Sequence, residues 1–100
     1  MEKFGRDIFN GVVSLEISGT MKEIPDSMFF NHLDLKEIFL SNSLCLRAIF
    51  SKAFYACNNL THIAFPSSLK LIYGCAFMEC KSLVEISIPP SVKCIESMLS

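Results

Sequence analysis

The chain has 100 residues, a length that suits one domain. It is 51% hydrophobic with a net charge of −1, which argues against a disordered segment and against a general nucleic-acid-binding protein. No apolar run approaches the ~20 residues that a membrane-spanning helix needs. The five cysteines are an odd number, which does not fit a small disulfide scaffold.

The N-terminal segment 1–11 differs from the sequence that follows it. It carries Glu2, Lys3, Arg6 and Asp7 and lacks the apolar repeat seen later, so we expect it to form an N-terminal cap. It also lacks the apolar core of a secretory signal peptide.

From residue 12 onward the sequence repeats. The phrase Ala-Phe-x-x-Cys-x-x-Leu-x-x-Ile begins at Ala53 and again, in the same register, at Ala76. The same register extends toward the N-terminus in weaker form, with two extra residues between Leu40 and Leu46. A fixed period of this length is typical of a solenoid of stacked coils. We therefore predict about four coils of 23–25 residues in 12–100, at 12–34, 35–59, 60–82 and 83–100, the last incomplete.

Each coil is predicted to begin with a short strand. Leu60, Ile63 and Phe65 follow the alternation of a strand with one buried face, and Pro66 ends the strand because it cannot donate a ladder hydrogen bond. A second extended segment then buries Ile72. The equivalent inward residues of the first strands are Val12, Leu15 and Ile17, then Leu35, Ile38 and Leu40, and finally Leu83, Ile86 and Ile88.

The Ala-Phe-x-x-Cys stretch closes each coil with helical spacing. Phe77 and Cys80 are three residues apart and so share a face, which favours a single helical or 3₁₀ turn. We expect Phe54 and Phe77 to stack inside the solenoid. Cys57 and Cys80 then lie within the range of a disulfide, but we expect two reduced thiols that act as small core residues.

These phrases, together with Pro-Ser-Val-Lys-x-Ile, resemble the BspA-like leucine-rich repeat family over Val12 to Ile95. The resemblance implies an α/β fold, a right-handed leucine-rich-repeat solenoid. It also implies surface or adhesion-type proteins of bacteria and protists that bind other macromolecules. The chain departs from the family pattern in its enlarged second coil and in Phe29-x-x-His32, which replaces Phe-x-x-Cys. The resemblance favours the cell surface and the missing signal peptide favours the cytoplasm, so the localisation stays open.

The sequence offers no residues for catalysis, a cofactor or a metal. His32 and His62 occupy different columns of the repeat, and no Cys-x-x-Cys spacing occurs. Glycine-rich phosphate loops, nucleophile elbows and paired carboxylates are also missing. Cys57 and His62 could form a nucleophile pair, but a core cysteine and an exposed strand histidine explain them more simply. We therefore expect a protein that is not an enzyme.

The outward positions of the first strands form the candidate binding face. On leucine-rich-repeat solenoids such columns line the concave surface. Phe39 is a candidate contact anchor, although it could instead pack against the enlarged coil. A solvated strand face is the alternative. The candidate residues are Glu37, Phe39, His62, Ala64, Glu85 and Ser87.

A basic residue recurs two positions before the isoleucine of each second segment. Adjacent members are expected about 5 Å apart at their bases, the spacing of neighbouring strands, where repulsion in water is only about 0.8 kcal/mol per pair. This column is either a solvated ladder or an anion-binding stripe for an acidic protein, a glycan or a lipid head group. Its members are Lys22, Arg47, Lys70 and Lys93.

Taken together, the patterns predict a non-catalytic recognition module that binds a protein or glycan ligand through its concave strand face. The alternative is a structural spacer within a longer repeat protein. We expect no cofactor, no nucleic-acid partner and no membrane span. The last coil stops before its turn, and Met98 and Leu99 do not form a polar cap. We therefore expect a fragment or a poorly capped solenoid that self-associates through its C-terminal edge or frays from about Val92 onward.

Overall fold

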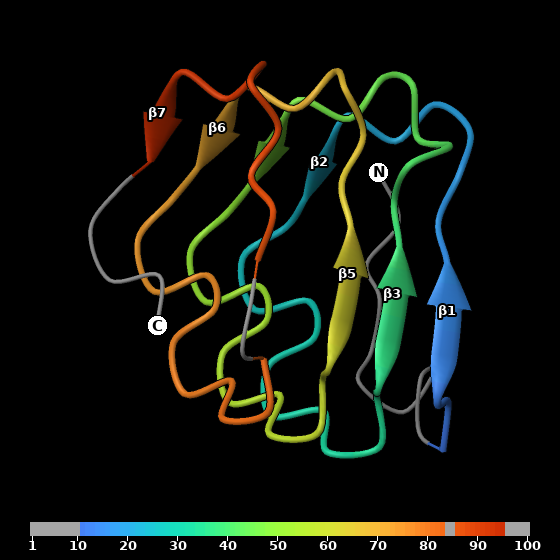
Figure 1. Cartoon of the computed structure of the whole chain (residues 1–100), viewed down its shortest axis with the longest axis vertical. Coiled ribbons are helices and arrows are strands. Elements are labelled where there is room, and N and C mark those ends of the chain that lie inside the picture. The colour runs from blue at the N-terminus through green and yellow to red at the C-terminus, as the bar shows by residue number, and fades with distance from the viewer. Residues whose placement is uncertain (1–10, 84–85, 96–100) are drawn as a thin grey trace.

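The computed structural model describes residues 11–83 and 86–95. Within these residues, short parallel strands form two sheets that face each other (Figure 1). The first sheet has the order β1-β3-β5, with β1 at Ser14–Glu16, β3 at Glu37–Phe39 and β5 at His62–Ala64. The second sheet has the order β2-β4-β6-β7, with β2 at Glu23–Ile24, β4 at Ala48–Ile49, β6 at Leu71–Ile72 and β7 at Cys94–Ile95.

The chain alternates between the two sheets once per coil. In Figure 1 each of the first three coils rises along a strand of the first sheet, crosses at the top to the second sheet and returns along the bottom. Successive coils advance from right to left in the same view. This path has the sense of a right-handed coil, which is the usual sense of a crossover between parallel strands.

The strand register follows the sequence repeat. In the first sheet Ser14 pairs with Glu37 and Glu37 with His62, each partner lying one repeat further along the chain. In the second sheet Ile24, Ile49, Ile72 and Ile95 form one continuous row. Equivalent positions of successive repeats therefore lie side by side, and the predicted solenoid with short parallel strands is confirmed.

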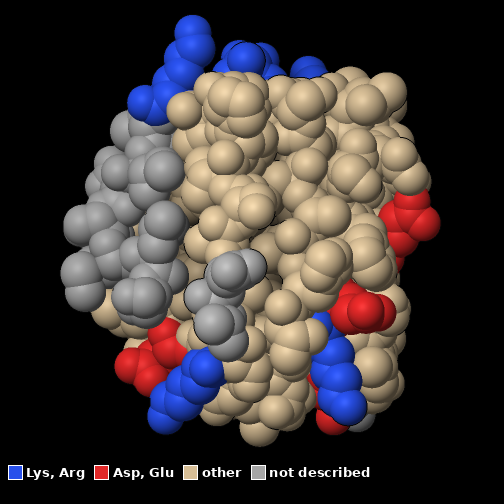
Figure 2. All heavy atoms as spheres, in the orientation of Figure 1, with Lys and Arg blue, Asp and Glu red and all other residues tan. Residues whose placement is uncertain are grey.

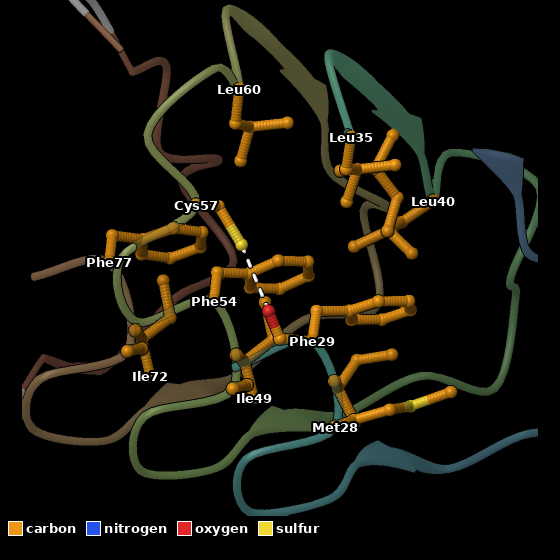
Figure 3. Close-up of a cluster of buried hydrophobic side chains, with 14 of the residues drawn as sticks. Met28, Phe29, Leu35, Leu40, Ile49, Phe54, Cys57, Leu60, Ile72 and Phe77 are labelled. Carbon is orange, nitrogen blue, oxygen red and sulfur yellow. Dashed lines mark hydrogen bonds between the residues drawn. The ribbon is translucent and has the colours of Figure 1, made fainter. Parts of the chain in front are cut away.

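The core lies between the two sheets and runs through all the described coils (Figure 3). Phe29, Phe54 and Phe77 stand in a stack, with 5.1 Å between neighbouring ring centroids and interplanar angles of 9° and 3°. All three rings are fully buried. Burying each such side chain contributes about 1.5–3 kcal/mol, so the stack is a principal link between coils.

The expected helical turn does not form in the described coils. Residues 53–57 make successive β-turns, in which the amide of Tyr55 donates to the Lys52 carbonyl (3.1 Å). The neighbouring amide of Ala56 instead donates to the Met78 carbonyl of the next coil (2.8 Å). Alternate amides therefore bind within the coil and across to the next one, whereas a helix would use every amide internally.

Two residues in the left-handed region bound this turn. Lys52 and Ala56 have φ values of 60° and 61°, and a right-handed helix cannot continue through such residues. The same pair of positions recurs in the coils before and after, at Ser27 and Asn31 and at Cys75 and Glu79. The first three coils are thus joined by a third row of hydrogen bonds in place of a helix.

The two extra residues of the second coil form an added turn after β3. The Ser43 amide donates to the Leu40 carbonyl (2.9 Å), and the Leu46 amide donates to the Ser43 carbonyl (3.0 Å). The Ser43 side chain is buried and its hydroxyl donates to the Ile17 carbonyl of the previous coil. Leu44, at the outside of this turn, is 73% exposed.

Three stretches of the chain lie outside the described residues, namely 1–10, 84–85 and 96–100. Residues 1–10 of the predicted N-terminal cap, the candidate Glu85, and Met98 and Leu99 of the expected uncapped end belong to them, whereas the edge strand β7 is described and pairs with β6. The strand expected around Ile86 and Ile88 has no strand pairing in the described part of the fourth coil, although both side chains pack against the core. Residues 11–83 and 86–95 contain no helix that could span a membrane.

Candidate functional site

The predicted binding face is the outer surface of the sheet β1-β3-β5. Ile38 of β3 points into the core and is fully buried, so the neighbouring Glu37 and Phe39 point outward. The parallel register places Glu37 beside His62 and Phe39 beside Ala64, as the repeat predicted. His62 is exposed, and the other three side chains are partly buried.

Phe39 packs along the sheet. Its ring lies 5.5 Å from the imidazole of His62, centroid to centroid, at an angle of 51°. The aromatic ring is therefore held by a residue of the next coil and still reaches the surface. Tilted contacts of this kind are favourable between aromatic rings, so Phe39 and His62 form one semi-rigid element of the face.

The N-terminal edge of this face is polar. Glu16 of β1 is exposed and accepts a hydrogen bond of 2.7 Å from the side-chain amide of Asn42. Asn42 belongs to the added turn after β3, so this contact ties that turn to the strand face. Ser87 is exposed but lies outside the strands, and Glu85 is not described.

Leu44 is a candidate that the repeat pattern did not single out. It is the most exposed large apolar side chain among the described residues, and Asn42 connects its turn to the strand face. The sequence signal was the two-residue insertion between Leu40 and Leu46, since an insertion in one copy of a repeat maps to a loop.

The basic column is an ordered row along one rim of the molecule. The Arg47 amide donates to the Lys22 carbonyl, Lys70 to Arg47 and Lys93 to Lys70, at 2.8, 2.8 and 2.9 Å. The four side chains are exposed. Figure 2 shows Lys and Arg atoms along the upper rim, where the strands of the second sheet begin in Figure 1, with no Asp or Glu atoms beside them on the face in view.

The row has no acidic partner in the described part of the chain. There, the one salt bridge joins Lys81 to Glu79 at 3.8 Å, on an exposed turn at another edge of the coil. The positive charges of the row therefore face solvent, and none of them forms an ion pair with a described carboxylate.

The thiols of Cys57 and Cys80 line the inside of the turns. Each donates a hydrogen bond of 3.0 Å to a phenylalanine carbonyl of the preceding coil, Cys57 to Phe29 and Cys80 to Phe54 (Figure 3 shows the first). The adjacent Cys80 side chain and burial raise the pKa of the Cys57 thiol, whereas the Cys57 side chain lowers the pKa of Cys80. Both are free cysteines. The half-buried Cys80 is therefore the first of the two to lose its proton as the pH rises.

The geometry of the described residues bears on two kinds of chemical site, a metal cluster and a Cys57–His62 nucleophile pair. No group of three or more His, Cys, Asp or Glu side chains within residues 11–83 and 86–95 could hold a metal ion. Cys57 is buried in the core column while His62 is exposed on the strand face, so they do not form a nucleophile pair.

Comparison with known proteins identifies the repeat. Residues 1–99 match six copies of the BspA type leucine rich repeat region. The structure is similar to the crystal structure of the T. pallidum leucine rich repeat protein TpLRR, with a TM-score of 0.77 and 27% identity. It is also similar to a leucine-rich repeat protein from Bacteroides ovatus, with a TM-score of 0.76 and 26% identity.

These solved solenoids are longer than the matched region. Each alignment covers 84% of this chain, but only 41% of the T. pallidum chain and 24% of the B. ovatus chain. A search of curated proteins gives no significant match. The comparisons therefore establish the repeat and the fold, and they leave the ligand to be inferred from the surface.

Proposed function

This chain belongs to the BspA type leucine-rich repeat family, and we propose that it is a non-catalytic module that recognises a protein through the outer face of the sheet β1-β3-β5. The solenoid supplies a rigid frame, because β1 is hydrogen-bonded to β3 and β3 to β5, across three successive coils. Adhesion at a cell surface is the role that this proposal favours.

The observation that carries the proposal is the combination of apolar and charged groups around β3. The ring of Phe39 reaches the surface beside His62, and Leu44 stands 73% exposed in the adjoining turn. Glu16 and Glu37 lie around them. Apolar anchors surrounded by polar groups are the usual composition of a protein-protein contact, in which aromatic residues contribute a large share of the affinity.

A spacer role is the second candidate. It is favoured by the length of the similar solenoids, of which this chain matches 41% and 24%. In a spacer, the stacked coils only set the distance between other parts of the solenoid, and the exposed strand residues contact only water.

Site-specific photo-crosslinking in the native cells separates the two. A photoreactive phenylalanine analogue is placed at position 44 or 62, both exposed, and a matched control is placed at the exposed position 81 on the far turn. Recognition predicts one discrete protein adduct from positions 44 and 62 and none from position 81.

The adduct should disappear when Phe39 is replaced by Ser in the same protein, because the anchor ring is lost while the strand remains. Adducts of equal yield from all three positions, or from none of them, would support the spacer and overturn the proposed recognition face.

A further inference from the structure

We propose that the row formed by Lys22, Arg47, Lys70 and Lys93, on the rim of the second sheet, binds a linear acidic polysaccharide. The row lies on a different sheet from the face proposed for protein recognition, so the two proposals stand on separate observations. Three features favour such a site: the regular spacing of the charges, the lack of a described ion pair within the row, and two aromatic rings that continue the surface.

The charges are spaced by the fold itself. Each basic residue is hydrogen-bonded through its backbone to the next member of the row, with N···O distances of 2.8–2.9 Å. Their backbones are therefore about 4.8 Å apart, the separation of neighbouring strands. A straight row of cations at this interval matches a polymer that presents an anionic group on successive sugar units, since one sugar unit has a similar length.

Four of the seven described bases belong to this row. Elsewhere the described residues carry the bases Lys36, Lys52 and Lys81 against the acids Glu16, Glu23, Asp26, Asp34, Glu37 and Glu79. A nucleic-acid-binding domain usually presents a broad basic face with a positive net charge, whereas the whole chain has a net charge of −1. A narrow row of positive charge on a chain of nearly neutral net charge suits one extended anionic chain.

Two aromatic side chains extend the row across the outer side of the second sheet. Phe50 and Tyr73 each follow a buried isoleucine, so strand alternation directs them outward. Both are partly exposed, and their rings meet edge to face with 5.0 Å between centroids. Aromatic rings pack against the apolar faces of sugars, which favours a polysaccharide over an acidic peptide.

The central members of the row are the ones to test. Lys22 is followed by Glu23, which weakens the local field, while Arg47 and Lys70 have a basic neighbour on both sides. The probe is heparin, a linear sulfated polysaccharide, titrated into the full chain by calorimetry at low and moderate salt.

The double variant R47Q/K70Q should bind heparin about tenfold more weakly at low salt. The slope of log affinity against log salt should become shallower by about two, one for each lost contact. The matched control is K36Q/K81Q, which removes the same charge from exposed positions outside the row and should keep both the affinity and the slope. Circular dichroism checks that both variants remain folded.

Three competitors decide the class of ligand. Polyglutamate and a single-stranded oligonucleotide of equal charge should compete less well than heparin, and neutral dextran should not compete. If both double variants lost the same heparin affinity, net charge alone would explain the binding, and the proposal would be overturned. Stronger binding of the oligonucleotide or of polyglutamate than of heparin would overturn it in favour of those ligands.

Discussion

Phe54 is the residue on which most of the stacking depends. Its ring is fully buried, and a parallel phenylalanine lies on each side of it, Phe29 in the preceding coil and Phe77 in the following one. Phe77 also meets Phe65 edge to face at 5.9 Å. Interior packing of this kind leaves little room for the core to collapse around a missing ring.

We therefore expect Phe77→Ala to lower the free energy of unfolding by about 3–5 kcal/mol, and Phe54→Ala to cost at least as much. Urea denaturation followed by circular dichroism measures both. Leu44→Ala is the control, because a side chain that is 73% exposed should cost under about 0.5 kcal/mol. A loss below about 1 kcal/mol at position 77 would contradict the stacked core.

The cysteines should differ in their reactivity toward an alkylating reagent in the native protein. Cys45 is exposed and should react first. Cys80 should follow, because it is only half-buried and its pKa is lowered by the neighbouring thiol, so its thiolate forms at lower pH. Cys57 should react last, because its pKa is raised and its side chain is buried. Mass spectrometry of partially alkylated protein gives the order, and a disulfide between Cys57 and Cys80 would contradict it.

At the scale of the element, each turn that leads from the second sheet back to the first contains two residues whose φ values lie in the left-handed region. Neither Lys52 nor Ala56 is glycine, although both have φ near 60°. A side chain in this region costs roughly 1–2 kcal/mol, so the turns carry strain that the coil-to-coil hydrogen bonds offset.

The prediction is that Ala56→Gly stabilises the protein by about 0.5–1 kcal/mol, because the gain from removing the strain exceeds the entropy lost on ordering glycine. The matched variant is Ala53→Gly, three residues earlier in the same turn, where the side chain is fully buried and φ is not positive. That change should destabilise the protein by about 1 kcal/mol. Thermal unfolding of both variants tests the contrast, and shifts of the same sign would argue against strain at position 56.

At the scale of the whole molecule, the core is one continuous cluster that runs from the first described coil to the fourth. Three sets of hydrogen bonds connect the first three coils, through the first sheet, the second sheet and the turns, and the second sheet continues into the fourth coil. Each coil buries its apolar face only against its neighbours, so a single coil has no stable fold of its own.

We accordingly expect one cooperative unfolding transition. Far-ultraviolet circular dichroism reports all strands, and the fluorescence of Tyr55 and Tyr73 reports the second and third coils. Their urea midpoints should coincide. Separate midpoints would show that the coils unfold as independent units, which the continuous core does not allow.

The sequence by itself determined the repeat and therefore the register. The recurrence at Ala76 of the phrase that begins at Ala53 was enough to predict which side chains share a column, including the stack of Phe54 on Phe77 and the row through Arg47 and Lys70. It also separated the buried Cys57 from the exposed His62. These features follow from sequence because a solenoid aligns equivalent positions whatever the local conformation of each coil.

Only the tertiary structure decided the backbone conformation of the turns and of the inserted loop. Phe54 and Cys57 have helical spacing, yet their turn is not a helix, because alternate amides bind the next coil and Ala56 is held at positive φ. Likewise the insertion after Leu40 was visible in the sequence, but not the burial of the Ser43 hydroxyl or the exposure of Leu44. Local spacing cannot foresee these outcomes, because the hydrogen-bond partners belong to neighbouring coils that are distant in the sequence.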